Sequence, residues 1–339
     1  MKSVLLSSPE SIKIIEMEKP VKKLGEALIR VRSVGICGSD IGAFRGTNPL
    51  ISYPRIIGHE IAGEIVEIDE IDENDGLKVG GRVIVNPYIY CKQCYPCLNN
   101  RTNCCEDLRV LGVHVDGGMQ EYFTHPANLL VPVPENISWE HVPLVEPLTI
   151  ALHAIHRTKL AAGEHIAVNG AGAIGLLVAL CAFAYGAVPI VVDVIDHRLA
   201  FARELGIVDT INASNGDMLE AIREKTDGRM AEVVVEASGA NEAIQNTLYM
   251  ASYIGRIALT GWPKDKTSLS TDLITKKELD ILGSRTSAGE FEEAIRLIET
   301  GKVNAKAILS NIISFDEIPR MIQEQSKNPD KYLKINALL

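Results

Sequence analysis

A glycine-rich segment at residues 168–175 makes this chain compatible with only a few folds. It reads Val-Asn-Gly-Ala-Gly-Ala-Ile-Gly, a G-x-G-x-x-G pattern. The residues just before it, His165 to Val168, have the length and content of a buried parallel strand. The residues after it, Ala173 to Tyr185, are mostly apolar and contain no proline, as expected for a helix packed on a sheet. The glycines are therefore predicted to form a strand-to-helix turn.

Each glycine of such a turn has its own function in binding the pyrophosphate of a dinucleotide. Gly170 would allow the tight turn, Gly172 would let the backbone approach the pyrophosphate, and Gly175 would let the helix pack closely on the strand. The first helical residues, Ala173 and Ile174, would point free N–H groups at the anion. The pattern alone also occurs in ordinary turns, so the flanking strand and helix are what favour a nucleotide site.

An acidic residue closes the next apolar strand, Pro189 to Asp193. It lies at roughly the 20-residue distance at which a carboxylate binds the adenosine ribose hydroxyls. Asp193 would repel a 2′-phosphate, and no arginine directly follows it. The sequence therefore predicts NAD rather than NADP, with Arg198 better placed to cover the adenine.

Length and charge narrow the remaining possibilities. A chain of 339 residues is long enough for two domains. Its formal net charge of −10 argues against nucleic acid and anionic membranes as partners. The N-terminus lacks a long apolar region, and no window approaches the ~18 apolar residues of a membrane span. We expect a cytoplasmic protein that acts on a small molecule and forms a homo-oligomer.

The period of the apolar residues changes near Glu146. Before it, short alternating runs such as Ala27 to Val34 predict a β-rich domain. After it, predicted strands at 165–168, 190–193, 232–236 and 256–260 alternate with helices at 150–159, 173–185, 198–205 and 241–251. This alternation predicts an α/β fold with a doubly wound parallel sheet. An amphipathic helix is expected from Glu290 to Thr300, and the acidic stretch from Asp69 to Asp75 is expected to be a solvated loop.

Most of the cysteines form one cluster. The chain has seven, at positions 37, 91, 94, 97, 104, 105 and 181. An odd, clustered set favours metal binding over disulfides in a reducing compartment. Cys91, Cys94 and Cys97, with either Cys104 or Cys105, supply the four thiolates of a closed tetrahedral zinc site. The alternative is a set of buried or free thiols, but the polar residues around the cluster do not form a core in which cysteine would act as a small hydrophobic residue.

A second group of candidate metal ligands consists of Cys37, His59 and Glu146, each beside glycine or proline. Taken singly, each has an ordinary explanation. Cys37 could be a small buried residue, His59 a hydrogen-bonded core histidine, and Glu146 an acid at a helix N-terminus.

Several segments occur in the order found in zinc-containing medium-chain dehydrogenases, and the chain resembles that family from end to end. They are Gly35-Ile-Cys-Gly-Ser-Asp40, Gly58-His-Glu60, the four-cysteine segment, Gly117-Gly-Met-Gln-Glu-Tyr122, Glu146-Pro147 and the glycine turn. Within the family it is most similar to polyol, threonine and sugar-acid dehydrogenases, because Glu146 stands where simple alcohol dehydrogenases have a second cysteine. Residues 48–49, 53–55 and 283–285 look most like the L-galactonate and L-gulonate branch.

The resemblance implies two zinc ions and two domains. A GroES-like catalytic domain would span residues 1–145, completed by 287–339, and a Rossmann NAD-binding domain would span 146–286. The catalytic zinc would lie on Cys37 and His59, with Glu60 and Glu146 binding directly or through water. In the structural zinc site the family spacing favours Cys105 over Cys104.

Two residues depart from the family pattern. Gly42 stands where many relatives have a histidine that helps carry the proton to solvent. Gly81 replaces a usual aspartate, which we expect to affect a turn and not the chemistry.

The implied reaction is hydride transfer from an alcohol to NAD. An open zinc site lowers the pKa of a bound hydroxyl, and Ser39 is the candidate first proton acceptor, unless it is a plain turn hydroxyl. A glutamate at 146 makes the metal site harder and favours a polyhydroxylated secondary alcohol. Arg285, Arg45 or Arg55 could bind a substrate carboxylate, although a surface salt bridge is the commoner role of an arginine.

Three alternatives stay open. The protein could be a threonine or simple-alcohol dehydrogenase of the same family. It could be a non-catalytic protein that binds NAD and zinc as a regulator, although none of the catalytic ligands is missing. A zinc-free quinone reductase is the third, and Cys37, His59 and the four-cysteine segment argue against it.

Overall fold

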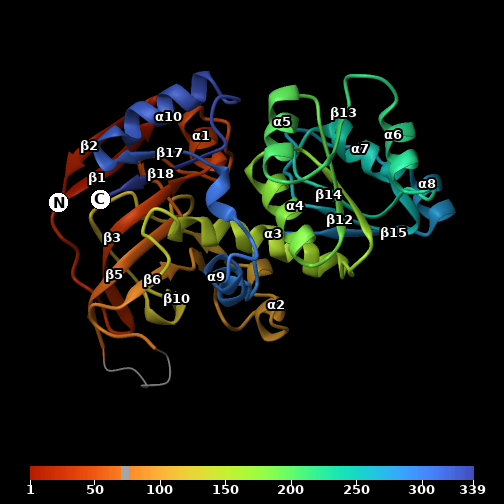
Figure 1. The fold of residues 1–339 in the computed structure, drawn as a ribbon. Coiled ribbons are helices and arrows are strands. Elements are labelled where there is room, and N and C mark those ends of the chain that lie inside the picture. Colours follow the sequence, from red (N-terminus) through yellow and green to blue (C-terminus); the bar gives the residue numbers. More distant parts are fainter. Residues whose placement is uncertain (70–75) are drawn as a thin grey trace. The chain divides into compact units, whose positions relative to one another are not determined.

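The computed structural model describes residues 1–69 and 76–339, and the chain divides into two compact units (Figure 1). Unit 1 comprises Met1–Glu146, Phe291–Glu299 and Ile308–Leu339, and unit 2 comprises Pro147–Glu290 and Thr300–Ala307. Both chain ends therefore belong to unit 1. Residues 70–75 lie outside the described part, so the solvated acidic loop expected between Asp69 and Asp75 stays a prediction.

Unit 1 is built mainly from antiparallel strands. Its largest sheet has the order β10 (Leu130–Pro132), β6 (Arg82–Val85), β5 (Glu60–Ile68), β3 (Glu26–Ile36), β18 (Lys334–Leu338) and β17 (Leu309–Ser314), with β9 (Tyr122–Pro126) also paired to β3. A three-stranded sheet has the order β2 (Ser11–Glu16), β1 (Lys2–Ser8) and β4 (Arg55–Ile56), and β7 (Tyr88–Ile89) pairs with β8 (Arg109–Val110). Strand β18, near the C-terminus, pairs with β3, so the last strand of the chain joins the sheet that β3, β5 and β6 form (Figure 1).

In the described part of unit 1, four α-helices accompany these strands. They are α1 (Gly38–Phe44), α2 (Tyr95–Leu98), α9 (Phe291–Glu299) and α10 (Ile318–Lys327). Alternate residues of the strands point into one apolar core, to which Ile29, Ile61 and Ile335 contribute fully buried side chains. Helix α9 lies within the predicted range of Glu290 to Thr300.

Unit 2 is a parallel six-stranded sheet with helices. The strand order is β13 (Asp209–Asn212), β12 (Val188–Asp193), β11 (His165–Asn169), β14 (Ala231–Glu236), β15 (Ala251–Leu259) and β16 (Asp280–Gly283). The helices are α3 (Val145–Thr158), which begins at the end of unit 1, and α4 (Ala173–Ala184), α5 (Asp196–Glu204), α6 (Met218–Lys225), α7 (Asn241–Met250) and α8 (Thr271–Lys277). In sequence order the strands read 3-2-1-4-5-6, which is the dinucleotide-binding arrangement. The predicted α/β class with a doubly wound parallel sheet is therefore confirmed.

Some elements differ from the sequence predictions. Helix α3 begins five residues before the expected Ile150, because Pro147 occupies its first turn, where a missing N–H costs nothing. Strand β13 was not predicted, since the sequence Asp-Thr-Ile-Asn has only one apolar residue. It is the edge strand of the sheet and pairs in parallel with β12.

Among the described residues, no helix is long and apolar enough to span a membrane. The homo-oligomer and the cytoplasmic location expected from the sequence stay predictions. The expected domain limits at residues 145 and 286 lie near the unit boundaries after Glu146 and Glu290, while residues 300–307 belong to unit 2.

Candidate functional site

The side chains of Cys37, His59 and Glu60 come together in unit 1. Their candidate ligand atoms all lie within 4.8 Å of one another. The register of two antiparallel strands explains this, because Gly35 of β3 pairs directly with Glu60 of β5. Cys37 follows the end of β3, and His59 immediately precedes β5, so the same end of the strand pair presents all three.

Two neighbours shape this cluster. A side chain at position 35 would not fit, because a Cβ atom there would lie 1.9 Å from Oε2 of Glu60. Asp40 fixes the start of helix α1, since its Oδ2 accepts a hydrogen bond of 2.9 Å from the backbone N–H of Cys37. The other oxygen, Oδ1, lies 3.9 Å from Nδ1 of His59. Asp40 therefore fixes the backbone at Cys37 and places a carboxylate oxygen near His59.

The donors of the cluster fit a zinc ion. A thiolate, an imidazole and a carboxylate are the ligand types of catalytic zinc sites. Oε2 of Glu60 and Nδ1 of His59 are buried and have no hydrogen-bond partner among the described residues. Such atoms cost free energy unless another group satisfies them.

Glu146 lies near the cluster but outside its three members. It is the second residue of α3, its side chain is buried, and Oε1 accepts a hydrogen bond from the hydroxyl of Tyr88. Burial raises the pKa of Glu146 to about 7, while the imidazole of His59 opposes the shift. Direct or water-mediated binding of zinc by Glu146 stays a prediction.

Sequence reasoning missed two residues beside the cluster, Tyr88 and Lys334. Burial, followed by the charge of Glu146, raises the pKa of Tyr88 well above its ordinary value, so the hydroxyl stays a donor. Lys334 forms a buried ion pair with Glu60 and donates a 3.1 Å hydrogen bond to the carbonyl of Ile36. A lysine at the start of the mostly apolar β18 was the available signal, but only the sheet shows what it contacts.

The pKa of His59 is set by burial and by the negative charges around it. Burial alone would lower the pKa of His59, but Cys37, Asp40 and Glu146 raise it well above its ordinary value. Ser39 is the neighbouring hydroxyl, with Oγ 3.5 Å from Nε2 of His59. The proton acceptor predicted from the sequence is thus within reach of the cluster.

The second group of thiols is Cys91, Cys94, Cys97 and Cys105, whose sulfur atoms all lie within 4.8 Å of one another. Cys104 is not a member of this set. Backbone N–H groups of Cys91 and Cys94 donate to sulfur atoms within the group, at 3.3 and 3.4 Å. Four convergent thiols with backbone donors fit a closed structural zinc site.

In unit 2 the glycine turn lies between β11 and α4. Gly170 has φ +118°, and a Cβ atom at Gly175 would lie 1.8 Å from the carbonyl oxygen of Gly170, so both positions require glycine. Nothing lies within 4 Å of a Cβ atom built at Gly172. The backbone there is therefore open to a ligand, which fits a bound pyrophosphate, and Ala173 and Ile174 begin α4 beside it.

Asp193 ends β12 and also supports the turn. Its Oδ2 accepts a 2.6 Å hydrogen bond from the backbone N–H of Ala171, and Oδ1 accepts one of 2.9 Å from Ile195. Arg198 lies 3.7 Å from Oδ2. The carboxylate thus holds the backbone between the first two glycines, while binding of the ribose by Asp193 stays a prediction.

The three candidate substrate arginines lie in different surroundings. Arg45 donates to Ser326 of α10, with a 3.1 Å bond from Nε to the hydroxyl. Arg55 pairs with Asp116 at 3.1 Å and donates to Ser52 at 2.6 Å. Arg285 is partly buried in unit 2. Binding of a substrate carboxylate by any of them stays a prediction.

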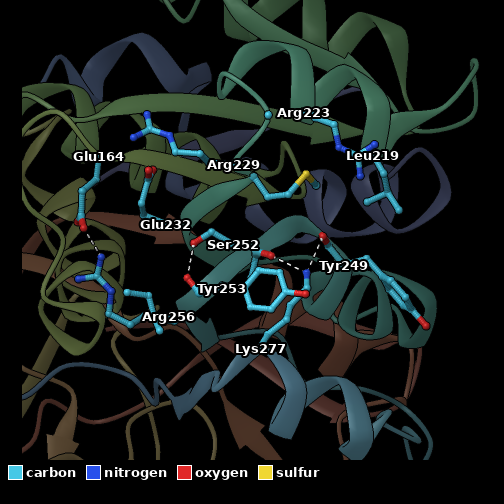
Figure 2. A pocket seen from close by; sticks show the side chains of 14 residues that line it. Glu164, Leu219, Arg223, Arg229, Glu232, Tyr249, Ser252, Tyr253, Arg256 and Lys277 are labelled. Carbon is cyan, nitrogen blue, oxygen red and sulfur yellow. Dashed lines mark hydrogen bonds and ion pairs between the residues drawn. The ribbon is translucent and has the colours of Figure 1, made fainter.

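A pocket of about 870 Å³ lies in unit 2, and its lining contains none of the site residues predicted from the sequence (Figure 2). Its lining includes Glu164, Glu232 and Ala251, at the amino ends of β11, β14 and β15. Ligands of parallel sheets bind at the opposite, carboxyl edge. Lys277 in this pocket donates to the carbonyls of Leu248 and Ala251, at 2.9 and 2.7 Å, so it stabilises the C-terminus of α7.

Comparisons with known proteins agree with this geometry. The model of the alcohol dehydrogenase GroES-like domain matches residues 23–135, and the model of zinc-binding dehydrogenases matches residues 173–300. An uncharacterized zinc-type alcohol dehydrogenase-like protein of Haemophilus influenzae is 57% identical, over 100% of this chain and 98% of that protein. L-galactonate-5-dehydrogenase of Escherichia coli is 36% identical, over 98% of both chains.

A solved structure extends the likeness to three dimensions. An alcohol dehydrogenase from Escherichia coli CFT073, complexed with NADH, matches with a TM-score of 0.93 and 34% identity, over 100% of this chain and 99% of that one. The family resemblance inferred from the sequence is therefore confirmed. The chain belongs to the zinc-binding alcohol dehydrogenase family, whose members are oxidoreductases with a GroES-like domain and a Rossmann-type parallel sheet.

Proposed function

We propose that this protein oxidises a secondary hydroxyl of a polyol or sugar acid, such as L-galactonate or L-gulonate, with NAD as the hydride acceptor. The cluster of Cys37 with the buried His59 and Glu60 is the observation that supports this most strongly. Relatives described as L-galactonate-5-dehydrogenase and sorbitol dehydrogenase are 36% and 32% identical to this chain.

The roles of the residues follow from their chemistry. Cys37 and His59 hold the catalytic zinc, with Glu60 and Glu146 supplying carboxylate oxygen directly or through water. Zinc, when bound, would act as a Lewis acid and lower the pKa of a substrate hydroxyl. Ser39 accepts the hydroxyl proton. Lys334 balances the charge of Glu60 and holds it beside the other ligands.

The acidic residues favour a substrate with several hydroxyl groups. A carboxylate in place of a second thiolate makes the metal site harder and suits oxygen-rich ligands such as vicinal diols. For an acid substrate, Arg285, Arg45 and Arg55 are the candidate carboxylate-binding residues, since a guanidinium group binds a carboxylate in a bidentate way.

The cofactor site is proposed at the carboxyl edge of the unit 2 sheet. Gly170, Gly172 and Gly175 shape the turn for the pyrophosphate, and the N-terminus of α4 attracts its charge. Asp193 binds the adenosine ribose and excludes a 2′-phosphate, and Arg198 covers the adenine.

A substrate screen tests the proposed reaction. NADH formation would be followed with L-galactonate, L-gulonate, sorbitol, threonine and ethanol as substrates. We expect kcat/KM to be highest with an aldonate or polyol. A preference for threonine or ethanol would assign the protein to the alternative dehydrogenase class. Binding of zinc and NADH without turnover of any substrate in a broad alcohol panel would favour the regulatory protein.

The choice of cofactor tests Asp193. Asp193→Ala should raise KM for NAD by roughly 10- to 100-fold, because charge-assisted hydrogen bonds to the ribose and to the turn are lost. KM for NADP should change far less, since repulsion of its 2′-phosphate is also removed. Asp196→Ala, at the start of α5, is the control and should leave both values unchanged. Better use of NADP than NAD by the unaltered protein would show the assignment to be wrong.

A further inference from the structure

Glu236 is a fully buried carboxylate at the carboxyl end of β14. Three donors converge on its Oε1 atom, namely the backbone N–H of Ser238 at 2.8 Å, the hydroxyl of Ser238 at 2.6 Å and the backbone N–H of Gly239 at 2.9 Å. One charged oxygen thus fixes the conformation of the loop that follows β14. Charge-assisted hydrogen bonds of this kind are stronger than neutral ones.

The same residue holds a second loop, the one that follows β15. The backbone carbonyl of Glu236 accepts hydrogen bonds from the N–H and the hydroxyl of Thr260, at 3.0 and 2.6 Å. A Cβ atom at Gly261 would lie 2.5 Å from Oε2 of Glu236. Oε2 has no hydrogen-bond partner among the residues that the structure describes. A charge left half satisfied in this way is costly, so packing alone does not account for an acid here.

Glu236 lies where the strand order of the sheet reverses. β11 pairs with β12 on one side and with β14 on the other, and Asn169 of β11 is directly opposite Glu236. The Ser238 loop lies against the glycine turn, since a Cβ atom at Gly170 would lie 3.1 Å from the backbone nitrogen of Ser238. Dinucleotides bind across such a reversal, one mononucleotide on each half of the sheet.

These observations divide the cofactor site between two acids. Asp193 ends β12, in the half of the sheet that would hold the adenosine end of the cofactor. Glu236 ends β14, in the half that would hold the nicotinamide mononucleotide end. We propose that Glu236 is a positioning residue that arranges the Ser238 and Thr260 loops for the nicotinamide half of NAD, without itself touching the cofactor. This inference rests on the proposed use of NAD.

Binding measurements can separate the two halves of the site. NADH and ADP would be titrated against the zinc-loaded protein, because ADP contains the adenosine and pyrophosphate but not the nicotinamide nucleotide. Glu236→Gln should raise the Kd of NADH by about 5- to 10-fold, as expected for loss of a charged hydrogen-bond acceptor. It should change the Kd of ADP by less than about twofold.

Two further variants separate positioning from stability. Glu232→Gln is the matched control, because Glu232 lies on the same strand and accepts a 2.8 Å hydrogen bond from the backbone of His165, at the opposite edge of the sheet. It should leave both dissociation constants unchanged, whatever its effect on stability. Ser238→Ala removes one donor to Glu236 and should raise the Kd of NADH by about 2- to 3-fold. This variant tests the inference even where Glu236→Gln does not fold.

The outcomes are distinguishable. Unchanged NADH affinity in a folded Glu236→Gln variant, or equal weakening of NADH and ADP, would overturn the positioning role while leaving the proposed function intact. With an unfolded Glu236→Gln variant, unchanged NADH affinity in Ser238→Ala would overturn it. A lack of NADH binding by the unaltered protein would overturn the proposed function and, with it, this inference.

Discussion

Among single residues, Glu146 has two possible roles. A carboxylate in the first turn of α3 interacts favourably with the helix dipole, by about 0.3–1 kcal/mol. An exposed acid would gain the same benefit from the helix dipole. The Glu146 side chain is instead buried beside His59, and it accepts a hydrogen bond from the hydroxyl of Tyr88. Because burying a carboxylate costs more than the dipole returns, the position favours a role at the metal site.

The substitution Glu146→Gln separates these roles. As a zinc-site residue it should lower kcat/KM by roughly 10- to 100-fold or weaken catalytic zinc, as loss of a metal-supporting group does. Asp272→Asn is the control, because Asp272 is an exposed acid in the first turn of α8. Near-normal kcat/KM with tightly held zinc would show that Glu146 only stabilises the helix. The zinc ligands would then be Cys37, His59 and Glu60.

At the scale of secondary-structure elements, strand β15 contains backbone strain at Ile254. Ile254 has φ +56°, a left-handed conformation that is unfavourable for a β-branched residue, and its side chain is 75% exposed. Ile254→Gly should raise the free energy of unfolding by about 1 kcal/mol, as measured by urea denaturation. Tyr253→Gly is the control, and we expect it to destabilise the protein. Destabilisation by both substitutions would show that the Ile254 side chain makes a stabilising contact.

A second element-scale feature is the link between α3 and the segment before α9. Glu290 is buried and lies 2.7 Å from Nδ1 of His153 and 3.5 Å from Nδ1 of His156. Burial alone would raise the pKa of Glu290, but the hydrogen bonds from His153 and His156 lower it to about 2. There is therefore a pH range in which this carboxylate stays ionised in the folded chain but takes up a proton in the unfolded chain.

The sign of the pH effect follows from this difference. As the pH falls from about 5 to 3, the unfolded state binds a proton at Glu290 and the folded state does not, so stability is lost. The loss should be about 2 kcal/mol larger in the unaltered protein than in Glu290→Gln. Unfolding free energies at pH 5, 4 and 3 measure it, with exposed Glu292→Gln as the control. Parallel pH profiles for the unaltered protein and Glu290→Gln would contradict the ion pair.

At the scale of the whole molecule, the two ligand clusters predict two zinc ions that differ in how tightly they are held. The purified protein should hold about two zinc ions per chain, because both clusters offer zinc ligands. A chelator should remove the ion at Cys37 and His59 first, with loss of activity, since a catalytic site keeps an open position. The ion on the four cysteines should resist removal by the chelator. Its loss should unfold the protein. A ratio near one zinc with full activity would contradict the two-site interpretation.

Local sequence patterns were sufficient to predict much of the fold and of the candidate sites. The glycine turn, Asp193 and the cysteine spacing are short-range patterns, and each depends on backbone geometry within a few residues. The parallel sheet followed from alternation of apolar strands and helices. The sequence could therefore predict the fold class, the nucleotide turn and a four-thiol site by itself.

Only the tertiary structure decided the surroundings of the candidate catalytic cluster. Lys334 reaches Glu60 because β18, from the far end of the chain, pairs with β3. Tyr88 reaches Glu146 across 58 residues of sequence. Burial, and therefore each shifted pKa, depends on how these distant segments pack, and no local pattern contains that information. The ligands could be named from the sequence, but the groups that orient and charge them became visible only when the strands were paired.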